Sequence, residues 1–152
     1  MSGPQPGRDV PVIVIHSLAH AVAALSAAAE AGRPVVIASA PDAGIYAGPG
    51  WFGAVLRTAR EAVPGAQCTA LLDCGDDAGA AMAAIRAGIP GVVFIGHADV
   101  ARRLADIAVQ KGARLITERP APAFDLGAPF FADDETVRRR CADALASPPV
   151  FC

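Results

Sequence analysis

The sequence alternates short runs rich in valine and isoleucine with longer alanine-rich runs that carry charges at helical spacing. Strands that are regularly separated by helices pair in parallel and connect through right-handed crossovers. The strand-like runs are almost entirely apolar, as is typical of parallel strands whose two faces are both covered. This pattern predicts an α/β fold with about five parallel strands alternating with helices.

The boundaries of these elements follow from glycine and proline residues between the runs. The expected strands cover residues 10–15, 34–39, 67–72, 91–95 and 113–117. The expected helices cover residues 18–31, 51–63, 77–87, 99–111 and 133–146. A glycine-rich loop is expected over 41–50 and a proline-rich loop over 120–129. Glycine directly after several helices predicts left-handed C-caps.

The length of 152 residues is that of one ordinary domain and is short for a complete (β/α)₈ barrel, which needs about 250 residues. We expect a flexible N-terminus over 1–9, a single α/β domain over 10–146 and a C-terminal tail over 147–152. No apolar run is long enough to cross a membrane, and the net charge of −2 argues against a nucleic-acid surface. The four cysteines form no CxxC pair or disulfide framework, which predicts a cytoplasmic protein.

Polar side chains occur where the predicted strands end, which is where parallel α/β folds bind ligands. They are His16, Ser17, Ser39, Asp42, Asp73, Cys74, Asp76, His97, Thr117, Glu118 and Arg119. These residue types serve in metal binding and acid–base chemistry. Some have a simpler explanation, because Ser17 and Asp77 suit helix caps. Asp73 directly follows an apolar run, so its carboxylate must be solvated or paired.

The loop over 41–50 holds more glycine than a simple connector needs. Its backbone amides and the start of the next helix would suit a phosphate group. It lacks the Gly-Lys-Ser/Thr ending of a phosphate-binding P-loop. A structural loop, or an oligomer contact through Tyr46 and Trp51, is the competing interpretation.

Several stretches of the chain match one known family in order and spacing. Residues 34–39 and 43–48 form a strand and a Gly-Ile-Tyr-containing loop, residues 70–75 read Ala-Leu-Leu-Asp-Cys-Gly, and residues 84–96 and 112–118 follow as a helix and two strands. Together they resemble the class II, zinc-dependent fructose-bisphosphate aldolase family. Residues 70–75 resemble the His-x-Asp-His-Gly strand end of that family.

The resemblance covers about residues 10–119 and implies the front half of an aldolase barrel. It implies that Asp73 is the catalytic residue that moves a proton during carbon–carbon bond cleavage. It implies that Ser39, Gly44 and Tyr46 bind substrate. Cys74 falls where the family has a zinc-binding histidine, and thiolate can also bind zinc. Glu118 matches a glutamate near the metal, and His97 is a further candidate ligand.

The chain also departs from the family. Ile95 stands where the family has an aspartate, and Arg119-Pro120 replaces Leu-Gly. The other two zinc histidines and the segments that bind the substrate phosphate belong to the family's second half, which this chain ends too early to supply. The resemblance thus implies zinc as the cofactor, whereas the chain offers fewer than the roughly three protein ligands that a catalytic zinc needs.

Two functions of different classes remain open. The first is a non-catalytic binding or assembly module, a half-barrel whose exposed sheet edges must be covered, one by the proline-rich stretch with Phe124, Phe130 and Phe131 and the other by self-association. The second is a metal-dependent lyase or aldolase for a small phosphorylated or carbonyl substrate, with its site completed across a homo-oligomer. For the fold, a flavodoxin-like open sheet is the alternative to the half-barrel.

Overall fold

The computed structural model describes residues 10–122, 124–127 and 133–146. Six strands form one parallel sheet in the order β5-β4-β3-β2-β1-β6, and helices alternate with them. The strands are β1 (Val12–Ile15), β2 (Val35–Ser39), β3 (Cys68–Asp73), β4 (Gly91–Val93), β5 (Arg114–Ile116) and β6 (Phe124–Asp125). The helices are α1 (Leu18–Ala31), α2 (Ala43–Tyr46), α3 (Gly48–Ala62), α4 (Ala78–Arg86), α5 (Ala98–Gln110) and α6 (Asp134–Ala146).

The predicted α/β class is confirmed, and the five predicted strands lie within two residues of β1 to β5. These five strands are arranged in chain order, so β2 lies between β1 and β3. A flavodoxin-like sheet has the order 2-1-3-4-5, in which β1 lies between β2 and β3. The flavodoxin-like alternative is therefore wrong.

The sixth strand is a departure from the prediction, which had a proline-rich loop over 120–129. Phe124 and Asp125 pair in parallel with β1, with Ile13 opposite Phe124 and Val14 opposite Asp125. Leu126 N–H extends this pairing with a hydrogen bond to Val14 O at 3.0 Å. The free edge of β1 is thus covered by the stretch that contains Phe124, as expected. Phe130 and Phe131 lie outside the described residues, as do the expected flexible ends over 1–9 and 147–152.

The chain divides into two compact units. Unit 1 consists of Met1–Ile37, Val55–Thr69 and Pro120–Cys152, and unit 2 consists of Ala38–Ala54 and Ala70–Arg119. Each is described by itself below. The expectation of a single α/β domain over 10–146 stays a prediction.

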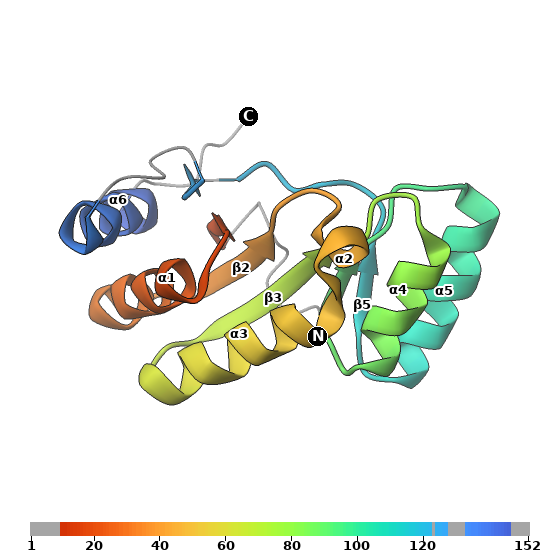
Figure 1. Cartoon of the computed structure of the whole chain (residues 1–152), viewed down its shortest axis with the longest axis horizontal. Helices are drawn as coiled ribbons and strands as arrows, with labels where there is room; N and C mark the ends of the chain where they lie inside the picture. The colour runs from red at the N-terminus through yellow and green to blue at the C-terminus, as the bar shows by residue number, and fades with distance from the viewer. Residues whose placement is uncertain (1–9, 123, 128–132, 147–152) are drawn as a thin grey trace. The chain divides into compact units, whose positions relative to one another are not determined.

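In unit 1, helix α1 packs against α6, and the two lie side by side (Figure 1). The buried positions of α1 are mostly alanine, which allows a close approach of the two helices. Helix α6 buries Val137, Cys141 and Leu145, a spacing of four residues that places all three on one face. The helix ends behave as predicted: Ser17 Oγ accepts a hydrogen bond from His20 N–H, and Gly32 has a φ of 62°.

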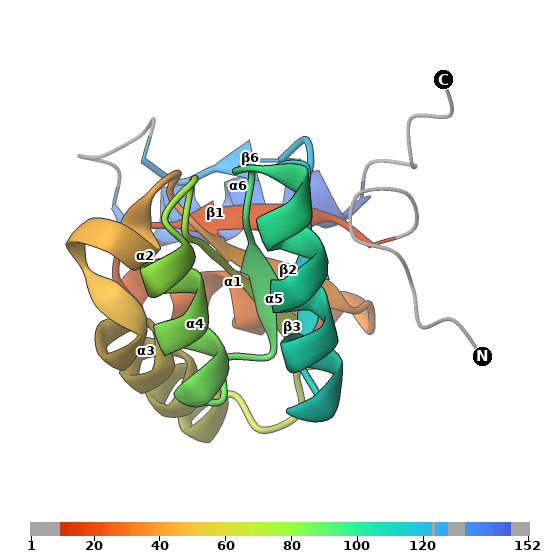
Figure 2. The same ribbon diagram turned by 90° about the vertical axis from the view of Figure 1, so that its right-hand side faces the viewer.

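In unit 2, strands β3, β4 and β5 pair in parallel, and helices α4 and α5 lie alongside each other (Figure 2). Asp77 caps α4 as predicted, because its Oδ1 accepts a hydrogen bond from Ala80 N–H at 2.8 Å. Gly91 at the start of β4 allows close pairing, since a Cβ there would lie 2.5 Å from the carbonyl oxygen of Ala70.

The glycine-rich segment over 41–50 was predicted as a loop, and that prediction is wrong. It forms the short helix α2 and the first turn of α3, which begins at Gly48 rather than near Trp51. The sequence did not predict these helices because the stretch is rich in glycine and proline, and both residues have low helix propensity. Proline is nevertheless tolerated in the first turn of a helix, where its missing N–H would have no partner, and Pro49 lies there.

Candidate functional site

The candidate site lies at the carboxyl ends of β2 and β3 in unit 2, and its centre is the carboxylate of Asp73. Asp73 is the last residue of β3 and is only 5% exposed. Arg119 donates two hydrogen bonds to it, from Nε to Oδ2 at 2.7 Å and from Nη2 to Oδ1 at 3.1 Å. Its backbone N–H donates to the hydroxyl of Ser39, the buried last residue of β2, at 2.9 Å. The sequence placed Asp73 just after the strand and required its carboxylate to be solvated or paired; the structure shows that it ends β3, buried and paired with Arg119.

Two backbone amides complete the surroundings of Asp73. The N–H groups of Asp42 and Gly75 donate to Oδ1 at 3.0 and 2.9 Å. Asp42 has a φ of 63°, and it is the one non-glycine residue with positive φ among the described residues. Such a conformation costs a non-glycine residue about 1–2 kcal/mol. The hydrogen bond from its amide to a buried carboxylate helps to offset that strain.

The electrostatic balance around Asp73 keeps it ionised. Burial alone would raise the pKa of this carboxyl, but the hydrogen bonds from Arg119, Asp42 and Gly75 and the positive charge of Arg119 outweigh burial and hold the pKa below its usual value. Arg119 also forms an ion pair with Asp42 Oδ1 at 3.0 Å. The three side chains carry one positive and two negative charges, a net charge of −1.

Cys74 and Gly44 pack tightly against each other next to Asp73. The Cys74 side chain is fully buried, and burial followed by the negative charges of Asp73 and Asp77 raises the pKa of its thiol to about 12. Gly44 in α2 is packed so tightly that a Cβ there would lie 2.5 Å from Cys74 Sγ. Gly75, with a φ of 54°, leaves no room for a side chain because the Asp42 carboxylate occupies that space. The turn after β3 is thus a close-packed backbone structure.

The residues predicted to bind metal do not gather. Within the described ranges, no three His, Cys, Asp or Glu side chains lie where they could hold a metal ion together. The His97 side chain is 72% exposed, and its Nδ1 accepts a hydrogen bond from Asp99 N–H at 3.1 Å. Glu118 is exposed as well. The arrangement does not fit zinc, and the assignment of Cys74, Glu118 and His97 as ligands stays a prediction.

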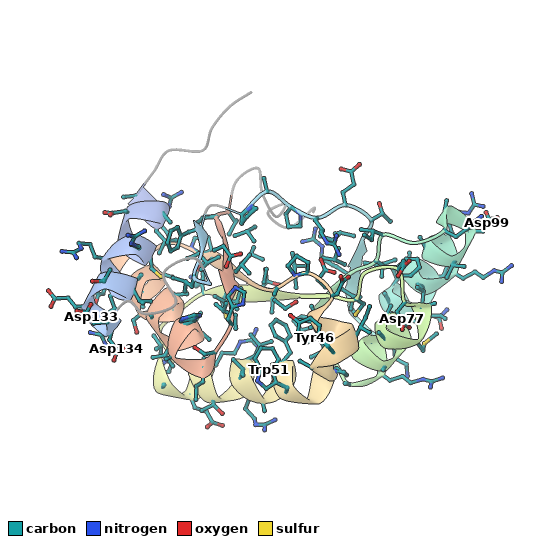
Figure 3. All side chains as sticks on the ribbon, turned by 45° about the horizontal axis from the view of Figure 1, so that its top comes forward. Tyr46, Trp51, Asp77, Asp99, Asp133 and Asp134 are labelled. Atoms are coloured by element: carbon teal, nitrogen blue, oxygen red, sulfur yellow. The ribbon has the colours of Figure 1, made fainter. Side chains whose placement is uncertain are left out.

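The residues predicted to bind substrate have different surroundings. Ser39 and Gly44 are buried beside Asp73 and Cys74, whereas the Tyr46 side chain is 70% exposed. Figure 3 shows Tyr46 and Trp51 on the α2 and α3 segments of unit 2. Their roles as substrate contacts stay predictions.

Four exposed apolar residues lie in α2, at the start of α3 and just after β4. They are Ile45, Tyr46, Trp51 and Ile95, which are 46%, 70%, 37% and 41% exposed. We call these four residues the apolar patch. Ile45 and Ile95 are linked through Gly75: the Ile95 N–H donates to Gly75 O at 2.8 Å, and a Cβ on Gly75 would lie 3.4 Å from Ile45 Cδ1. Ile95, where the resembled family has an aspartate, thus contributes an apolar side chain here.

Sequence reasoning named Arg119 and Asp42 at this edge but missed their connection to Asp73. A signal was present, because a buried carboxylate needs a partner and Arg119 is the one arginine or lysine among the polar strand-end residues. Sequence reasoning also missed His20 in unit 1, which follows His16 by four residues. That spacing is the signal that would have drawn attention to a pair of histidines.

Comparison with known proteins supports the fold. No family model matches the chain, and no curated protein matches its sequence. Among solved structures, a putative fructose-1,6-bisphosphate aldolase from Coccidioides immitis matches with a TM-score of 0.59 and 19% identity, over 72% of this chain and 40% of that one. A probable tagatose 6-phosphate kinase from Sinorhizobium meliloti matches with a TM-score of 0.53 and 18% identity, over 90% of this chain and 45% of that one.

These similarities are at low sequence identity and speak to the fold alone. The chain spans less than half the length of either solved structure. No helix among the described residues is both long and apolar enough to cross a membrane. The chain has an aldolase-like α/β fold in which a parallel sheet alternates with helices.

Proposed function

We propose that this chain is a non-catalytic binding or assembly module built on an aldolase-like fold. One observation carries the proposal: Asp73 accepts four hydrogen bonds, two from Arg119 and one each from the amides of Asp42 and Gly75. Oδ1 accepts three of these bonds and Oδ2 accepts the fourth from Arg119 Nε, so the carboxylate, which is only 5% exposed, is held mainly by groups of the protein itself. An acid–base residue must exchange a proton with its substrate, and this carboxylate is committed to the protein.

The lyase alternative has less support. Within the described residues, no three His, Cys, Asp or Glu side chains lie where they could hold a zinc ion together, and the Cys74 side chain is fully buried. A phosphorylated substrate would meet the net negative charge of Arg119, Asp42 and Asp73. We therefore do not extend the proposal to a phosphorylated ligand at this edge.

The apolar patch supplies the surface for assembly, and we infer that its partner is a second copy of this chain. Aromatic residues are enriched in the centres of protein interfaces, and the patch contains Tyr46 and Trp51. A two-fold interface places the same surface on both partners. Apolar side chains can meet their own copies without charge repulsion, so this patch suits such an interface.

The lack of pairing among Cys68, Cys74 and Cys141 is in keeping with the cytoplasm as the location of the protein.

Sedimentation velocity at micromolar concentration tests the assembly. We expect the wild-type chain to sediment as a dimer and the Tyr46→Ser variant as a monomer. Val109→Ser is the matched control, because Val109 is 76% exposed and lies on α5 outside the patch. A wild-type monomer, or equal dissociation of both variants, would contradict assembly through the patch.

Metal analysis and an activity assay test the absence of catalysis. We expect the purified chain to contain no stoichiometric zinc and to leave fructose 1,6-bisphosphate uncleaved. Cleavage that disappears in Asp73→Asn would overturn the proposal, because Asn keeps the shape of the side chain and removes its charge. That result would assign Asp73 the catalytic role implied by the family resemblance.

A further inference from the structure

A second cluster of polar side chains lies in unit 1, at the carboxyl ends of β1 and β6. It consists of His16, His20 and Asp125. His16 Nε2 lies 2.6 Å from Asp125 Oδ1, and the backbone N–H of His16 donates to His20 Nδ1 at 3.1 Å. The two imidazole rings meet edge to face with their centroids 6.1 Å apart. Three side chains with proton-accepting groups thus share one sheet edge.

The hydrogen bonds fix where the protons lie on the two rings. Asp125 is an acceptor when ionised, so a neutral His16 carries its proton on Nε2 and offers the Nδ1 lone pair as an acceptor. His20 Nδ1 already accepts a hydrogen bond, so a neutral His20 carries its proton on Nε2 and offers it as a donor. Burial and the nearby His16 lower the pKa of His20 against an opposing effect of Asp125, which favours this neutral form.

Backbone packing holds this arrangement in place. Gly127 N–H donates to Asp125 Oδ1 at 2.8 Å, which orients the carboxylate. A Cβ on Gly127 would lie 2.5 Å from His16 Nε2, so only glycine lets the turn after β6 approach the ring. The His16 side chain nevertheless remains 31% exposed. No other hydrogen bond to His16 Nδ1 or His20 Nε2 occurs within the described part of the chain.

We propose that His16, His20 and Asp125 form a binding site for an uncharged small molecule with neighbouring oxygen atoms, a polyol or a hydroxycarbonyl compound. A ligand hydroxyl donates to His16 Nδ1, and a neighbouring ligand oxygen accepts from His20 Nε2. The carboxylate of Asp125 places a negative charge in the cluster. That charge disfavours phosphates and carboxylates and favours a neutral ligand.

This site is independent of the proposed function, because that function rests on residues of unit 2. Failure of dimerisation or of the non-catalytic assignment leaves the histidine site unaffected. An alternative role for the His16–Asp125 pair is to hold β6 against β1. The two roles differ in their prediction for ligand binding, since a purely structural pair has no reason to respond to a small molecule.

Nitrogen-15 spectra of the imidazole rings, recorded on the full chain, test the site. We expect the Nε2–H tautomer for both His16 and His20. Titration with dihydroxyacetone, a neutral hydroxycarbonyl compound, is expected to shift the ring nitrogens of both residues and to saturate. His97 is an internal control, because it is 72% exposed and lies in the other unit. The Nδ1–H tautomer at His16, no shift, or an equal shift at His97 would overturn the proposal.

Two variants and a charged probe test the role of His16 and the preference for a neutral ligand. His16→Gln removes the proposed acceptor and is expected to weaken dihydroxyacetone binding by about threefold to tenfold, the effect of one hydrogen bond. His97→Gln is expected to bind as the wild type does. Dihydroxyacetone phosphate is expected to bind more weakly than dihydroxyacetone, and tighter binding would overturn the assignment of a neutral ligand. The wild-type spectra decide the question even where His16→Gln fails to fold.

Discussion

Arg119 holds the buried carboxylate of Asp73 through two nitrogens, with Nε 2.7 Å from Oδ2 and Nη2 3.1 Å from Oδ1. Asp73 ends β3, and Arg119 follows β5, while β4 lies between the two strands. The ion pair therefore connects two strand ends that do not pair with each other. It ties the segment after β5 to the centre of the candidate site.

Removing the guanidinium should destabilise the chain. In Arg119→Ala, Asp73 keeps two amide donors but loses its counter-charge, so we expect a loss of about 1–3 kcal/mol in the free energy of unfolding. The Arg119 side chain is 38% exposed, and solvent screening places the loss toward the lower end of that range. Urea denaturation at neutral pH, followed by circular dichroism, measures it.

Arg119→Lys is the matched control for this experiment. Lysine restores the positive charge but not the two parallel hydrogen bonds of the guanidinium, so we expect an intermediate stability. Equal stability of Arg119→Ala and the wild type would mean that the ion pair contributes nothing.

The lowered pKa of Asp73 predicts how stability depends on pH. Because the pKa in the folded state lies below that in the unfolded state, about 3.9, the charged carboxylate stabilises the fold above that value. This contribution is lost as the pH falls through the unfolded pKa toward the folded one. We expect the stability difference between the wild type and Asp73→Asn to stay constant from pH 6 to about pH 5 and to shrink from there to pH 3. A constant difference across that range would show that ionisation of Asp73 does not matter.

Gly44 should be intolerant of any side chain. Gly44→Ala places a methyl group against Cys74 Sγ and the Asp73 backbone, and such overpacking costs about 1–3 kcal/mol. Gly50→Ala is the control, because a Cβ on Gly50 meets nothing within 4 Å and alanine favours the helix α3. Thermal denaturation should show a lower midpoint for Gly44→Ala only. Equal midpoints would mean that α2 moves aside at little cost.

The cysteines should differ in reactivity. Cys74 and Cys141 are buried with thiol pKa values raised to about 12 and about 11, whereas Cys68 is half-buried. Because the thiolate is the reactive form, iodoacetamide at pH 8 should label Cys68 before Cys74 and Cys141 in the folded chain. Mass spectrometry of the peptides identifies the labelled residues. Labelling of Cys74 as fast as Cys68 would contradict a closed, close-packed turn after β3.

Much of the fold could be predicted from the sequence, because the strands and helices follow from local apolar patterning. The caps at Ser17 and Asp77 are equally local and were predicted correctly. Helix α2 was missed because glycine hides its helical character. Strand β6 was missed because its two residues pair with β1 more than a hundred positions earlier, and no local pattern reveals such a partner.

The sequence predicted which residues lie at the candidate site but not the contacts between them. Sequence position put Ser39, Asp73 and Arg119 at one edge, but the bidentate ion pair depends on side-chain geometry that no spacing rule contains. The left-handed conformation of Asp42 is a tertiary effect as well, since it brings the amide to Asp73. The resemblance to an aldolase directed attention to Asp73 as a catalytic residue and away from the arginine that holds it.

The position of β6 beside β1 has a consequence during protein synthesis. The segment that covers β1 is made 109 residues after His16, which at a typical rate of about 5–20 residues per second means a delay of about 5–20 s. Until then, one edge of the apolar strand Val12–Ile15 has no partner from this segment. Unpaired strand edges are templates for aggregation. The nascent chain is therefore most vulnerable to misassembly before residue 125 has left the ribosome.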